Sequence, residues 1–120
     1  MIEIYKMTND LVTALKTVMP NVFPMLAPQG TSLPFITYQH TGFAPEGSKD
    51  GEYSASTTYN ITIVTGDYSS GLQYVDACRR AINGITSDKY QYEHIVVGAN
   101  EQAYDDGYSQ VLTITLEASR

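Results

Sequence analysis

From Tyr53 to Thr65 the chain reads YSASTTYNITIVT, and two kinds of side chain alternate along all of it. Successive residues of a strand point to opposite faces of a sheet. One face is predicted to carry Tyr53, Ala55, Thr57, Tyr59, Ile61 and Ile63, and the other carries serine, threonine and asparagine. This pattern is typical of a half-buried antiparallel strand, here long enough to project beyond the core.

Three more strands are predicted around it, from alternating β-branched and aromatic residues, at Phe35–Thr41, Tyr90–Gly98 and Ser109–Ala118. The segments between the strands contain turn residues. Asn21–Leu33 holds closely spaced prolines, which predict an ordered connector without ladder hydrogen bonds. Residues 42–52 predict a long mobile loop, and residues 100–107 predict a polar loop.

Two segments carry the helical period instead. Asn9–Met19 has one apolar stripe, formed by Leu11, Ala14, Leu15, Val18 and Met19. The second helix is predicted from about Ser70 to Asn83, where Ser70 and Gln73 fit a capping box. Cys78 falls on its buried stripe, so we expect a small core residue rather than a nucleophile.

The elements follow in the order helix, strand, strand, helix, strand, strand. Most joints are too short for parallel crossovers. We therefore predict one α+β domain over residues 1–120, with a mostly antiparallel sheet of four to five strands and both helices packed on one face.

Composition narrows the function classes. Seven basic and 13 acidic residues give a net charge of −6, which argues against binding to nucleic acid or anionic lipid. Charged residues make up only 17% of the 120 residues, so part of the surface is expected to be apolar or neutral and to meet a partner. A signal peptide and a membrane-spanning run are not visible, and a cytoplasmic protein is the simplest expectation.

The sequence shows no catalytic, cofactor or metal motif. Gly42 and Gly47 have the spacing of a phosphate-binding loop, but serine follows instead of lysine. His40, Cys78 and His94 are far apart and lack the spacing of metal ligands, so we predict neither metal nor cofactor.

Two charged pairs have a plainer explanation than chemistry. Asp105-Asp106-Gly107 predicts a turn rather than a metal site. Arg79-Arg80 is expected on a solvated helix face or in an ion pair.

Ten tyrosines without a tryptophan are the unusual feature of the composition. Tyr53 and Tyr59 fit the core face of their strand, whereas the others fall mainly at loops and strand ends. Such tyrosines suit a protein interface and equally well the rim of the core.

The chain resembles the small tail-completion proteins of long-tailed bacteriophages, also called tail terminator or head–tail joining proteins. The resemblance is carried by Phe23-Pro24-Met25-Leu26-Ala27-Pro28-Gln29-Gly30 and by the following Pro34-Phe35-Ile36-Thr37-Tyr38. A long strand, a helix opened by Tyr68 and a closing strand after Tyr104 complete it over nearly the whole chain. Val22-Phe23 stands where the family often has Ile-Tyr, which is a conservative change.

The resemblance implies a non-enzymatic structural protein of a phage or prophage, present in the bacterial cytoplasm during assembly and then in the virion tail. Such a subunit forms a ring, usually a hexamer, on the tail-tube protein and then meets the head–tail connector. The two predicted loops are the candidate contact segments. The candidate contact residues are Phe43, Glu46, Lys49, Asp50, Tyr53, Tyr104, Asp105, Asp106 and Tyr108.

Two other classes stay open. A small α+β ligand-binding or protein-interaction module would need a concave pocket with convergent polar groups. A stand-alone enzyme would need the fold to bring together an acid–base pair such as His94 and Asp105.

Overall fold

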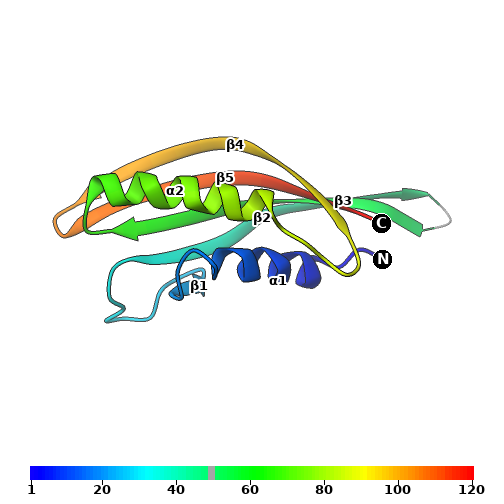
Figure 1. The fold of residues 1–120 in the computed structure, drawn as a ribbon. Coiled ribbons are helices and arrows are strands. Elements are labelled where there is room, and N and C mark those ends of the chain that lie inside the picture. The colour runs from blue at the N-terminus through cyan, green and yellow to red at the C-terminus, as the bar shows by residue number, and fades with distance from the viewer. Residues whose placement is uncertain (49–50) are drawn as a thin grey trace.

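In the computed structural model, the described residues (1–48 and 51–120) form two helices and a five-stranded mixed sheet, so the fold class is α+β (Figure 1). The elements are α1 (Ile4–Leu15), β1 (Val22–Pro24), β2 (Phe35–Ser48), β3 (Gly51–Thr65), α2 (Tyr68–Asn83), β4 (Gln91–Tyr104) and β5 (Gly107–Ser119). They build an elongated body with extents of 53, 25 and 23 Å.

The strand order is β1-β2-β3-β5-β4, and every neighbouring pair is antiparallel except β1 with β2. β3 lies at the centre, and its predicted alternation is confirmed by the buried side chains of Ala55, Thr57, Tyr59, Ile61 and Ile63. Tyr53 is 57% exposed, so its placement in the core is wrong. It lies beyond Ser54, the last residue of β3 that pairs with β5.

The predicted order of elements lacks β1. Val22–Pro24 pairs in parallel with Ile36–Tyr38, although Pro28 and Pro34 follow it before β2. β1 is an edge strand of three residues, and Pro24 is its last residue, where a missing amide hydrogen is tolerated.

The helix packing differs from the prediction that both helices pack on one face of the sheet, because only α2 makes extensive contacts with the strands. α2 contacts β5, β3 and β4, whereas α1 packs beside α2 (Figure 1). Side-chain hydrogen bonds connect α1 to the sheet. The Thr8 Oγ1 and Tyr59 Oη atoms are hydrogen-bonded at 2.8 Å, and the Tyr92 hydroxyl donates to Asp10 at 2.5 Å.

Both helices begin earlier than predicted. α1 starts at Ile4 because its buried stripe is Met7, Leu11 and Leu15, one turn nearer the N-terminus than the predicted stripe. α2 starts at Tyr68, and its N-cap is Asp67, whose carboxylate accepts from the Ser70 amide at 2.9 Å. Two hydrogen bonds from Ser70 hold the pKa of Asp67 below its usual value.

Both predicted loops are largely strand. Within residues 42–52, the described residues continue β2 and β3 as a hairpin, with register shifts at His40/Gly42 and Glu46/Gly47. Residues 100–104 and 107 are paired in β4 and β5, so only Asp105 and Asp106 form the turn. Glycines that signalled loops are accommodated at these register shifts and at the turn.

Candidate functional site

The candidate contact residues fall into two groups at opposite ends of the molecule. The β2–β3 hairpin extends from the Gly51 end of β3, whereas Tyr108 pairs with Thr65 at its other end (Figure 1). Fourteen residues of strand separate these ends, which is roughly 45 Å. The fold therefore presents two contact regions and does not bring the predicted residues into one site.

The hairpin group consists of Phe43, Glu46 and Tyr53, all of them exposed. Phe43 pairs with the buried Thr57, so its side chain lies on the same face of the sheet as the core, past the cover of the helices. Lys49 and Asp50, which the prediction also placed here, lie outside the described residues.

The second group surrounds the turn between β4 and β5. Asp105 and Asp106 are exposed at its tip, and Tyr104 pairs with Gly107 at its base. The ring of Tyr108 makes an edge-to-face contact with the ring of Tyr68, with centroids 5.6 Å apart. This contact places Tyr108 at the rim of the core.

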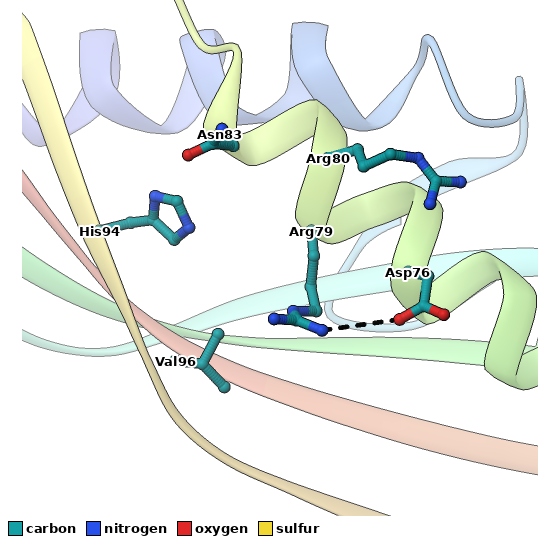
Figure 2. Close-up of a pocket in the computed structure, with 6 residues that line it drawn as sticks. All are labelled: Asp76, Arg79, Arg80, Asn83, His94 and Val96. Carbon is teal, nitrogen blue, oxygen red and sulfur yellow. Dashed lines mark ion pairs between the residues drawn. The ribbon is translucent and has the colours of Figure 1, made fainter.

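A groove lies between α2 and β4, and its volume is about 310 Å³ (Figure 2). Residues at i, i+3, i+4 and i+7 of α2 form one wall, and two alternate residues of β4 form the other. The six lining residues are Asp76, Arg79, Arg80, Asn83, His94 and Val96. His94 and Val96 face α2 because they pair with Leu116 and Ile114 of the buried face.

The groove gathers two of the seven basic residues of the chain. Arg79 lies 3.6 Å from the Asp76 carboxylate, in a pair whose side chains are more than half exposed (Figure 2). Exposed ion pairs of this kind contribute little to stability. Arg80 takes part in no ion pair among the described residues. The groove therefore suits an anionic group.

Next to the groove runs the open edge of the sheet. Within the described part of the chain, β4 pairs with β5 alone, so its outer backbone groups have no strand partner. Ile95, Val96 and Val97 are 66%, 44% and 59% exposed along it. An exposed apolar edge strand can pair with a strand of another chain. The register shift between Val96 and Gly98 interrupts the regular edge at one point only.

The middle of the sheet face away from the core is polar and uncharged, and Glu93 and Glu117 lie on this face nearer the end of β5. Thr58 and Thr115 are hydrogen-bonded through their hydroxyls at 3.0 Å, and the Thr113 hydroxyl donates to Asn60 at 2.8 Å.

The fold does not bring together His94 and Asp105, the example of an acid–base pair that the sequence offered. His94 pairs with Leu116, and ten residues of β4 separate it from Tyr104 at the turn, which is roughly 33 Å. Among the described residues, no group of three or more histidine, cysteine or carboxylate side chains is placed to hold a metal ion. Cys78 is buried, as predicted, and burial raises the pKa of its thiol to about 12.

Sequence reasoning missed the groove. It had interpreted Arg79 and Arg80 as a solvated face or an ion pair, and Arg79 does make one. The available signal was the spacing of Asp76, Arg79, Arg80 and Asn83 along one helix face. His94 carried no such signal, because only the sheet register brings it opposite the helix.

No protein-family model matches the chain, and a search of curated proteins finds no significant match. In the described residues, neither helix is long and apolar enough to span a membrane.

Proposed function

We propose that this chain is a non-enzymatic structural protein of a phage or prophage tail, a ring-forming subunit that caps the tail tube and joins it to the head connector. The observation that carries the proposal is the open edge of β4, with Ile95, Val96 and Val97 exposed beside a charged groove. Monomeric proteins normally cover or charge such an edge, and a subunit of an assembly does not need to.

The segments that carry the resemblance to tail-completion proteins support the proposal, because they are adjacent in the fold. Phe23 and Pro24 of the first segment pair with Thr37 and Tyr38 of the second. The Met25 amide donates to the Tyr38 carbonyl at 2.9 Å and extends this pairing. The resemblance therefore corresponds to one structural unit, the β1–β2 edge of the sheet.

The two contact regions at the ends of the body fit a subunit with two kinds of neighbour. In the proposed ring, lateral contacts join copies of the chain, and the surfaces that these contacts leave free meet the tail-tube protein on one side and the connector on the other. Assembly takes place in the bacterial cytoplasm, and the finished ring remains in the virion tail.

A second candidate is a small α+β ligand-binding or protein-interaction module. The groove between α2 and β4 favours it, since Arg79, Asn83 and His94 offer hydrogen-bond donors around an apolar Val96 (Figure 2). A screen of anionic small molecules by calorimetry tests this candidate directly.

The proposed function is tested by deleting the gene from the phage or prophage that carries it and imaging the particles by electron microscopy. We expect filled heads without joined tails, or tails of uncontrolled length, and restoration by the gene supplied in trans. Normal joined tails of fixed length in the deletion strain would refute the proposal.

A further inference from the structure

We propose that copies of this chain join head to tail, with the acidic β4–β5 turn of one copy seated in the basic groove between α2 and β4 of the next. This inference rests on the proposed ring and names its lateral contact. The occupant of the groove is therefore a second copy of the chain.

The turn and the groove carry side chains of opposite charge. Asp105 and Asp106 are exposed at the turn and take part in no ion pair among residues 1–48 and 51–120. Arg79 lines the groove and has only a long, exposed contact with Asp76 of the same helix, whereas Arg80 lies at the rim with its guanidinium group turned away from His94 and Val96 (Figure 2). A guanidinium group binds a carboxylate through paired hydrogen bonds, so the two aspartates of the turn can replace Asp76 at Arg79 and bind Arg80 at the rim.

The separation of the two surfaces makes the contact intermolecular. The groove lies at His94 and Val96 of β4, and the turn begins after Tyr104 of the same strand. About 8–10 residues of extended strand, or roughly 26–33 Å, lie between them. A copy cannot place its own turn in its own groove, whereas a neighbouring copy can.

Two different surfaces in one contact define a heterologous interface. Such an interface leaves a free turn and a free groove on every added copy until the rotation closes a ring. This is the symmetry that a ring requires, and an interface of β4 with β4 of a second copy would stop at a dimer instead.

The dimensions agree with this assignment. The turn is two residues long, and the groove, at about 310 Å³, is at the small end of ligand-sized cavities. It therefore suits two short carboxylate side chains at the tip of a hairpin. Val96 lines the groove and is 44% exposed, so it adds apolar area to the contact.

Charge reversal tests the contact by sedimentation velocity at low salt, at protein concentrations up to about 1 mM, the range that detects weak association. Wild-type chain should associate, and the association should weaken as salt is added. Reversal of the groove (Arg79→Glu with Arg80→Glu) and reversal of the turn (Asp105→Arg with Asp106→Arg) should each weaken association about 100-fold, since like charges then meet.

An equimolar mixture of the two charge-reversed variants tests whether the groove and the turn contact each other. In an alternating assembly every groove then meets a turn of opposite charge, so association should return in the mixture while each variant alone stays monomeric. The matched control is Lys16→Glu with Lys89→Glu, which makes the same charge change on exposed sites outside the groove and should associate like wild type.

A second measurement fixes the geometry. Asn83→Cys combined with Asp106→Cys should form disulfide-linked oligomers on mild oxidation, and Lys16→Cys combined with Asp106→Cys should not. Cys78 does not interfere, because it is buried. A wild-type chain that stays monomeric throughout, a mixture that fails to associate, or equal cross-linking of the two cysteine pairs would each overturn the inference.

These outcomes separate the inference from the proposed function. Restored association in the mixture, together with normal tails in the deletion strain, would keep the contact and refute the tail role. Unjoined tails in the deletion strain that are rescued equally well by wild type and by either reversed variant would keep the tail role and refute the contact.

Discussion

Replacing Gly107 by alanine should destabilise the chain and disturb the β4–β5 turn. A Cβ atom at position 107 would lie 2.5 Å from the Thr65 carbonyl oxygen, closer than side-chain carbons approach backbone atoms. Because the obstacle is backbone of β3, relief requires the strands to shift. Overpacking of this kind costs about 1–3 kcal/mol, and we expect about 2 kcal/mol after the lower chain entropy of alanine is included.

The measurement is urea unfolding at 25 °C followed by tyrosine fluorescence, with a thermal melt as a second probe. For a chain of this size, about 2 kcal/mol corresponds to a decrease in Tm of roughly 6–10 °C. Gly98→Ala is the matched control, since a Cβ atom there meets no described atom within 4 Å. Equal stability of the two variants would show that residues 105–107 are not held as a tight turn against β3.

Three further predictions concern the core and the cap. Tyr59→Phe should lose about 1 kcal/mol of unfolding free energy, because the hydroxyl bonded to Thr8 is removed; a double-mutant cycle with Thr8→Val should show coupling, and additive effects would contradict it. Asp67→Ala should destabilise α2 at neutral pH. Because the folded pKa of Asp67 is lowered, the stability that Asp67 contributes is present above its ordinary pKa of 3.8 and is lost as pH falls through the folded pKa. Thermal melts of the variant and of wild type from pH 7 to 2 should therefore converge at low pH. A difference in Tm that stays constant with pH would contradict this prediction. Cys78, whose thiol pKa is raised to about 12, should react with a thiol reagent at pH 8 only as fast as the chain opens, and fast labelling of the native chain would place it outside the core.

The fold class could be predicted from the sequence because its signals are local. The period of two in β3 and the period near 3.6 in α2 both arise from one buried face, and the structure places both faces in the same core. The burial of Cys78 followed from the same reasoning.

The loops were predicted wrongly because glycine, proline and charged residues were interpreted as breaks. Pro45 pairs with Ala55 on one side, and among the described residues no strand pairs with its other side, which is the edge position where proline is tolerated. Gly47 lies at a register shift, where a Cβ atom would come within 2.5 Å of the Gly51 carbonyl oxygen. In long hairpins such residues shape the strands rather than end them.

The groove could not be predicted because it depends on distant pairings. Its two walls come from Asp76–Asn83 and from β4, and their separation is set by how β4 pairs with β5 and how α2 lies on the sheet. The two ends of the body likewise become separate contact regions only through the register of β3 with β2 and β5.

The central claim, a ring at the end of a phage tail, is tested most directly by locating the chain on purified virions. A copy carrying a small epitope tag at its N-terminus should be labelled by gold-conjugated antibody at one place on each tail, at the junction with the head, and image averaging should show a closed ring of identical subunits there. Label along the whole tail, label at the distal tip, or virions that do not contain the chain would contradict the account.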